Sequence, residues 1–145
     1  MNNIETLYRQ VIMDHYKNPR NKGLKGYKQV HLRNPSCGDD IYIEADIENG
    51  TVKKVCHDGS GCAICCSSAS VMTELLSGKK VEEANKIVDT YLRMIKGEAI
   101  ENEEILDEAF VFQGVSKFPA RLKCATIAWK AMEELLGEKQ WTIII

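Results

Sequence analysis

The 145-residue sequence has little of several features that would point to particular classes of protein. No uninterrupted apolar run approaches the roughly 18 residues that a membrane-spanning helix needs. The opening residues, MNNIETLYRQ, lack the charged start and apolar core of a signal peptide. Neither sign of charge dominates, because 19 lysines and arginines stand against 21 acidic residues. General nucleic-acid binding needs a basic surface, so we expect the protein not to bind nucleic acid. Because the sequence shows neither a membrane span nor a signal peptide, we also expect a cytoplasmic protein that does not bind membranes.

Internal repeats and low-complexity linkers are also lacking, so we expect residues 1–145 to form a single domain. Hydrophobic residues make up 44% of the chain and charged residues 28%, which is typical of a folded globular protein.

The sequence does have six cysteines, and three of them fall within residues 62–66. In a secreted protein an even number of cysteines would suggest disulfides, but this chain shows no export signal. The cysteines therefore point to metal binding or sulfur chemistry. The six are Cys37, Cys56, Cys62, Cys65, Cys66 and Cys124.

Hydrophobic periodicity predicts both helices and strands. Residues 39–47 alternate as a half-buried strand does, and Asn49-Gly50 is typical of the turn that leads into a partner strand at 52–56. A weaker strand is expected near 29–32, and a flexible loop at 57–61. The predicted helices cover residues 4–16, 63–76, 81–96 and 119–136. Because a helix, then strands, then helices follow one another, we expect an α+β fold with an antiparallel sheet.

Three segments keep more than one interpretation. Residues 17–33 carry six basic residues and no acid, as a solvated loop or a docking surface for an acidic partner would. Residues 98–108 carry six acids and no base, as a solvated face or a short acidic helix would. The tail 141–145 is apolar and β-prone, and its pattern assigns it no place in the fold.

Four residues are candidate metal ligands. Cys37 and Asp39 flank Gly38 at the start of a predicted strand, where residues i and i+2 project to the same side. Cys62 lies at a predicted helix N-terminus, which stabilises a thiolate. Cys124 is flanked by basic residues, which favour the thiolate as well. Three thiolates and one carboxylate would suit zinc, or iron with sulfide.

The remaining cysteines and the histidines have other interpretations. Cys62 and Cys65 also form a C-x-x-C pattern, as in dithiol oxidoreductases, although that motif belongs to a βαβ context. Cys65 and Cys66 would supply alternative ligands or a resolving thiol, or simply pack as small apolar residues. Cys56, within a strand, is expected to be structural. The histidines are expected to be hydrogen-bonded or exposed; they are His15, His31 and His57.

Four segments, in the same order along the chain, resemble the IscU/SufU family of iron–sulfur scaffold proteins. They are LYRQVIMDHYKNPRN at 7–21, NPSCGD at 34–39, GSGC with SSAS within 59–70, and GVSKFPARLKC at 114–124. The resemblance implies a small α+β fold with a three-stranded sheet and the ligands gathered at one end. It implies that the metal ligands are Cys37, Asp39, Cys62 and Cys124. It also implies a pyridoxal-phosphate-dependent cysteine desulfurase as a partner that hands over persulfide sulfur, and apo iron–sulfur proteins downstream.

Two departures resemble the SufU branch more than the housekeeping scaffolds: Lys123 stands where those scaffolds carry a histidine, and residues 81–96 resemble an inserted helix. SufU-like proteins are read as zinc-dependent sulfurtransferases, and IscU-like ones as scaffolds that build a [2Fe–2S] cluster. Our first hypothesis is a sulfur acceptor that holds zinc and uses Cys37 as its nucleophile. The alternatives are a [2Fe–2S] scaffold and a structural zinc protein.

Overall fold

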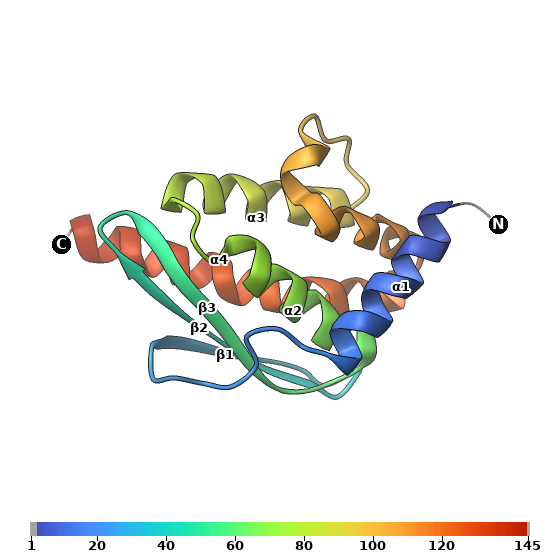
Figure 1. Cartoon of the computed structure of the whole chain (residues 1–145), viewed down its shortest axis with the longest axis horizontal. Helices are drawn as coiled ribbons and strands as arrows, with labels where there is room; N and C mark the ends of the chain where they lie inside the picture. Colours follow the sequence, from blue (N-terminus) through green and yellow to red (C-terminus); the bar gives the residue numbers. More distant parts are fainter. Residues whose placement is uncertain (1–2, 145) are drawn as a thin grey trace.

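The computed structural model describes residues 3–144, and its centre is a three-stranded antiparallel sheet with strand order β1-β2-β3. The strands are β1 (Lys28–Asn34), β2 (Asp39–Glu48) and β3 (Thr51–Ser60). Helices pack over one face of the sheet (Figure 1). The α+β class and the antiparallel sheet expected from the sequence are confirmed.

The hairpin between β2 and β3 forms as its turn sequence predicts. Asn49 and Gly50 both have positive φ angles, 51° and 76°, which a two-residue turn of type I′ requires. On β2 the side chains of Ile41, Ile43 and Ala45 alternate onto the buried face and join the hydrophobic core.

The flexible loop expected at 57–61 is wrong, because β3 continues to Ser60 and pairs Gly59 with Ile41. Glycine is depleted in strands, so Gly59 lowers the strand propensity of this segment, and the sequence alone does not indicate a strand here. At this position a Cβ atom would collide with the backbone oxygen of Asp40. A glycine is therefore needed for the two strands to approach each other here.

The predicted helices form, and the first three have small changes at their ends; the last, predicted over 119–136, begins later, at Leu122, and continues to Ile144. They are α1 (Asn3–Lys17), α2 (Ala63–Leu76), α3 (Val81–Ile95) and α4 (Leu122–Ile144); two 3₁₀-helical segments, η1 (Glu103–Lys117) and η2 (Pro119–Arg121), precede α4. The backbone of the β-prone tail is helical as far as Ile144, as part of α4. Among the described residues, no helix is long and apolar enough to cross a membrane.

The helices form two levels above the sheet. α2 packs on β3, and α4 packs on β1 and β2, while α3 lies against α4 and η1 (Figure 1). In the core between them, the ring of Tyr91 stacks on that of Trp129, with centroids 3.7 Å apart and planes 8° from parallel.

The basic stretch 17–33 is in large part ordered against the sheet. Its last six residues, 28–33, belong to β1, as the weak strand signal indicated. Before β1, the backbone N–H groups of Lys25 and Gly26 donate to the carboxylate of Glu44, and that of Gly23 donates to the carbonyl of His57. This segment therefore covers the outer side of β2 and the edge of β3.

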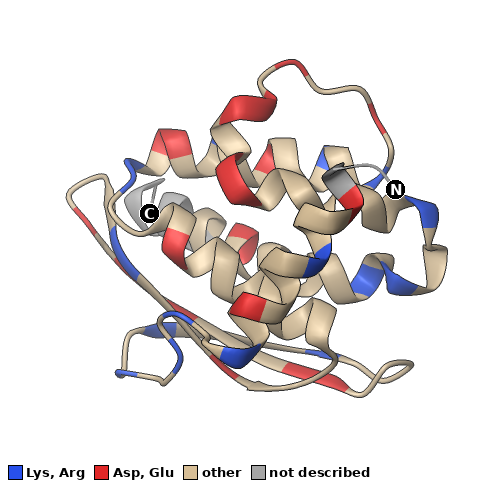
Figure 2. Ribbon diagram, turned by 45° about the vertical axis from the view of Figure 1, so that its right-hand side comes forward, with Lys and Arg blue, Asp and Glu red and all other residues tan. Residues whose placement is uncertain are grey.

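The acidic stretch 98–108 divides between an irregular segment, 98–102, and the start of η1. Figure 2 shows acidic residues gathered along this part of the chain. Within η1 the backbone kinks at Asp107, which has a φ of 48° and a ψ of −128°. The kink directly precedes Glu108, whose carboxylate reaches the buried ring of His15 on α1.

Candidate metal centre

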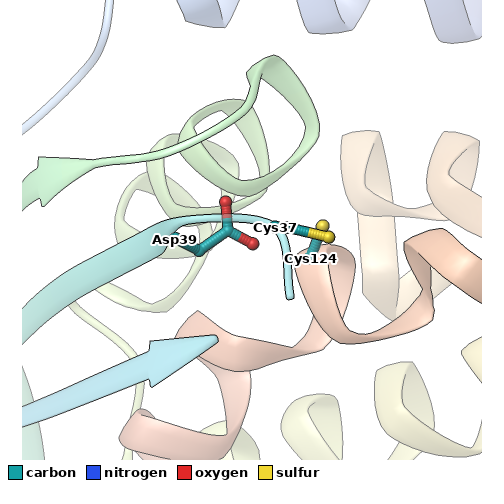
Figure 3. A group of neighbouring side chains, drawn as sticks. All are labelled: Cys37, Asp39 and Cys124. Carbon is teal, nitrogen blue, oxygen red and sulfur yellow. The ribbon is translucent and has the colours of Figure 1, made fainter. Parts of the chain in front are cut away.

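Two neighbouring segments of the chain and one that is distant in sequence meet at one end of the sheet. They are the β1–β2 turn, the beginning of β2 and the beginning of α4, and they bring Cys37, Asp39 and Cys124 together (Figure 3). One ligand atom from each of these residues lies within 4.8 Å of the others. Two thiol sulfurs and a carboxylate oxygen at this separation form a group that can hold a metal ion.

Asp39 is the buried anchor of the group, with 2% of its surface exposed. Its Oδ1 accepts a hydrogen bond of 3.0 Å from the backbone N–H of Cys62, and its Oδ2 accepts one of 3.3 Å from the side chain of Asn34. Gly61 lies so close that a Cβ atom there would be 2.6 Å from Oδ1. The carboxylate is thereby fixed before any metal binds.

Cys37 is the more accessible of the two thiols in this group. It lies on the turn between β1 and β2, beside Gly38, whose φ of 72° a glycine adopts without steric cost. Its sulfur is half-buried and lies 3.9 Å from the backbone oxygen of Ala120. Cys124, in contrast, is fully buried in the first turn of α4.

Cys62 lies beside this group without being part of it. It is the N-cap residue of α2, as its predicted position at a helix N-terminus implies, and its sulfur accepts the backbone N–H of Cys65 at 3.5 Å. Its own N–H is the donor to Asp39. Of the four predicted ligands, the structure therefore brings three within 4.8 Å and places the fourth next to them, with its sulfur over the first turn of α2.

The thiols of this group lie close together, beside the carboxylate of Asp39. Burial raises the pKa of the Cys124 thiol, and the neighbouring Asp39, Cys37 and Cys62 raise it further. The sulfur of Cys124 in turn raises the pKa of the exposed Arg121 guanidinium. These carboxyl and thiol neighbours disfavour the thiolate form of Cys124. A metal cation placed among them would favour the thiolate instead.

The chemistry of the donor set fits the metals expected from the sequence. Thiolates select zinc, copper(I) and iron–sulfur centres, and zinc also accepts carboxylate oxygen as a ligand. The group therefore suits zinc, or iron with sulfide.

Sequence reasoning assigned no role to Asn34, although it lies within the motif that contains Cys37. Its side-chain amide donates to Asp39 and lies 3.9 Å from the sulfur of Cys124, and its Oδ1 accepts from the hydroxyl of Ser36. Asn34 therefore orients two candidate ligands at once. Its position, three residues before Cys37 in the sequence, is the feature that indicates a role at the site.

The remaining cysteines and histidines are mostly engaged in the fold. Cys56 and Cys65 are fully buried, as small packed residues are, and burial raises the pKa of both thiols. Cys66 is half-buried, with its sulfur 3.6 Å from the oxygen of Gly61. The histidines are hydrogen-bonded or ring-stacked, as expected for His15, His31 and His57.

A match to a known protein family includes the residues of this site. The model of the NifU-like N-terminal domain matches residues 7–125, which is most of the chain and includes every candidate ligand. The chain belongs to this family.

Curated members of the family align over nearly the whole chain. The zinc-dependent sulfurtransferase SufU of Bacillus subtilis is 44% identical over 139 residues, which are 95% of each chain. The iron–sulfur cluster assembly scaffold protein IscU of Streptococcus pyogenes is 36% identical over 137 residues, 94% of this chain and 86% of that protein. The resemblance to the IscU/SufU family is thereby confirmed.

Solved structures of this NifU-like family share the fold. A crystal structure from Fervidobacterium islandicum, described as a candidate cluster assembly scaffold for the SUF system, superposes with a TM-score of 0.80. The two chains are 29% identical, and the match covers 91% of this chain and 98% of the other.

Proposed function

We propose that this NifU-like protein is a sulfur acceptor of the SufU type. In this role it takes persulfide sulfur from a pyridoxal-phosphate-dependent cysteine desulfurase and passes it toward apo iron–sulfur proteins in the cytoplasm. The observation that carries the proposal is the half-exposed thiol of Cys37 at the rim of a buried thiol–carboxylate group. The similarity to a zinc-dependent sulfurtransferase over nearly the full length supports it.

The ligands proposed for zinc are Cys37, Asp39, Cys62 and Cys124. For Cys62 to join the other three, its sulfur has to leave the backbone N–H of Cys65, from which it now accepts at 3.5 Å. When bound, zinc would hold these cysteines as thiolates at neutral pH. Asp39 is the harder and weaker ligand of a mostly soft set, which keeps the site open to exchange.

Cys37 is the proposed nucleophile. Its thiolate attacks the outer sulfur of the desulfurase persulfide, a new sulfur–sulfur bond forms on Cys37, and the desulfurase cysteine leaves as a thiolate. Cys124 is fully buried, so a partner's cysteine reaches Cys37 more readily. The exposed guanidinium of Arg121, beside the sulfur of Cys124, supplies positive charge where the persulfide arrives.

The test is Cys37→Ala, assayed for stimulation of a cysteine desulfurase and for transfer of labelled sulfur to the chain. We expect sulfur acceptance to be lost while circular dichroism shows an unchanged fold. Cys66→Ala is the matched control, because Cys66 is also half-buried and lies outside the proposed ligand set. Full acceptance in the Cys37 variant would refute the assignment.

A second function, a scaffold for a [2Fe–2S] cluster, is favoured by the same donor set and by the similarity to a protein named as a scaffold. It predicts a coloured cluster after anaerobic reconstitution and transfer of that cluster to an apo-acceptor. Asp39→Ala should then slow cluster release. Release at the parental rate from this variant would count against the scaffold.

Metal and acid-labile sulfide in anaerobically purified protein separate the two functions. About one zinc per chain without sulfide, together with stimulation of the desulfurase, is the result expected of the sulfur acceptor. Iron and sulfide in equal amounts would establish the scaffold instead.

A further inference from the structure

A second group of ligand atoms lies away from the thiol group, where α1, α2 and η1 meet (Figure 1). It consists of His15 on α1, Glu74 on α2 and Glu108 on η1, and one ligand atom from each lies within 4.8 Å of the others. We propose that these three residues bind a second divalent transition-metal ion, of the class that includes zinc and cobalt(II).

His15 is the fixed member of the group. Its ring is fully buried, with Nε2 2.7 Å from Oε1 of Glu108 and Nδ1 2.7 Å from the hydroxyl of Ser70. That hydroxyl also accepts the backbone N–H of Arg20 at 2.8 Å, so its position is set by the chain. A histidine whose second ring nitrogen is held by an oxygen is the usual arrangement at a metal site, because the partner fixes the ring and its tautomer.

The two glutamates are the adjustable members. Their side chains are 54% exposed at Glu74 and 42% exposed at Glu108. Each carboxylate can therefore rotate to the bond length of about 2.0–2.2 Å that zinc needs, without disturbing the core. The ion would thus be approached from the solvent side and anchored on the buried imidazole.

A cavity of about 610 Å³ adjoins the group and supplies room for the remaining ligands. Both Glu74 and Glu108 line it, together with apolar residues that include Leu7, Val71 and Val111. Water molecules in this cavity would complete the coordination of the ion. The cavity also gives the ion a path to the two glutamates.

The local charge leaves room for a cation. Lys79 also lines the cavity, and its ammonium donates to the backbone oxygen of Leu75 at 3.0 Å. Arg20 has its Nε 3.8 Å from a carboxylate oxygen of Glu74. Its guanidinium makes the shorter contacts elsewhere, 2.8 Å to Asp14 and 2.9 Å to the backbone oxygen of Asn18. Arg20 can therefore keep these partners while Glu74 turns toward an ion.

The donor set distinguishes this site from the thiol group. One imidazole and two carboxylates contain no sulfur, whereas the thiol group is dominated by thiolates. Cobalt(II) bound through nitrogen and oxygen shows ligand-field absorption without the intense thiolate-to-metal charge-transfer bands. The spectrum therefore reports which of the two sites is filled.

The experiment adds one equivalent of zinc to the whole chain and then titrates cobalt(II), followed by absorption and by calorimetry. Zinc occupies the thiol group first, and it is retained there because zinc binds more tightly than cobalt(II). We expect about one further cobalt(II) per chain with no thiolate charge-transfer band. Glu74→Gln and Glu108→Gln should each weaken this binding on the order of 10–100-fold or more, since even the loss of a group that only hydrogen-bonds to a ligand weakens binding by that range.

Glu103→Gln is the matched control, because Glu103 is an exposed acid on η1 outside the group. It should bind the second ion as the parent does. The two glutamate variants are exposed enough to fold normally, so the test does not depend on replacing buried His15. Absence of a second cobalt(II), or parental affinity in both glutamate variants, would overturn the proposal. The result is independent of sulfur acceptance, which the titration does not measure.

Discussion

His57 shows at the scale of a single residue how burial changes an ionisable group. It lies on β3 with its ring buried, and its Nε2–H donates to the backbone oxygen of Arg20 at 2.9 Å. Burial is the main cause that lowers the pKa of this imidazole, and the nearby positive charge of Lys22 lowers it further. The folded protein therefore holds His57 in its neutral form.

This neutral histidine predicts a pH dependence of stability. Its pKa in the unfolded chain is about 6.5, above the folded value, so the unfolded state takes up the proton first as the pH falls. The contribution of His57 to the free energy of unfolding is therefore fully present above about pH 6.5 and decreases as the pH falls below that value, by at most about 1.4 kcal/mol per pH unit. His57→Gln keeps a donor for Arg20 and removes the titration. Urea unfolding between pH 8 and pH 5 should show a steeper loss in the parent, and parallel curves would contradict the assignment.

The junction between β3 and α2 shows what one element contributes to another. Gly61 connects the last strand to the N-cap of α2 and passes directly over Asp39. The sequence predicted the strand and the helix, but not that the junction touches the carboxylate. The contact matters because the same junction carries the N–H that holds Asp39 in place.

Gly61→Ala is therefore expected to displace Asp39, a proposed metal ligand, without a change in backbone conformation. The new Cβ would lie 2.6 Å from Oδ1 of Asp39 and 3.3 Å from its Cα, closer than such contacts allow. We expect metal affinity, measured by competition with a chelator, to fall by about 10-fold or more. Gly114→Ala is the control, since no heavy atom lies within 4 Å of the position of its Cβ. Equal affinities for the two variants would show that the contact does not constrain Asp39.

At the scale of the whole molecule, a buried polar cluster joins three helices. The hydroxyl of Ser68 on α2 accepts the indole N–H of Trp129 on α4 at 2.9 Å and donates to the backbone oxygen of Ala125 at 3.0 Å. The hydroxyl of Tyr91 on α3 donates to the same oxygen at 2.8 Å. This cluster fixes how α2, α3 and α4 pack above the sheet.

Ser68→Ala should destabilise the molecule as a whole, because it leaves the buried N–H of Trp129 without its acceptor. The expected loss is about 1–3 kcal/mol in the free energy of unfolding, measured by urea denaturation. Ser67→Ala is the matched control, because the Ser67 hydroxyl is also buried but donates only to Ile64 within the same helix. Similar losses in both variants would show that the cluster contributes nothing beyond local helix bonding.

The sequence by itself determined the parts of this protein that depend on local periodicity and turn chemistry. The repeat of apolar residues defined the helices, and Asn49-Gly50 defined the hairpin, because both signals lie within a few residues. Local chemistry also placed Cys62 at a helix N-terminus. The positions of Cys37, Asp39 and Cys124 within their motifs were sufficient to nominate them as ligands.

The tertiary structure decided everything that depends on contacts between distant segments. The strand character of 57–60 follows from close pairing with β2, which the glycine conceals in the sequence. The role of Asn34 requires a residue 90 positions away, and the group at His15 brings together residues of three elements. Such contacts leave no local signal, because each side chain meets its partners only after the helices have packed on the sheet.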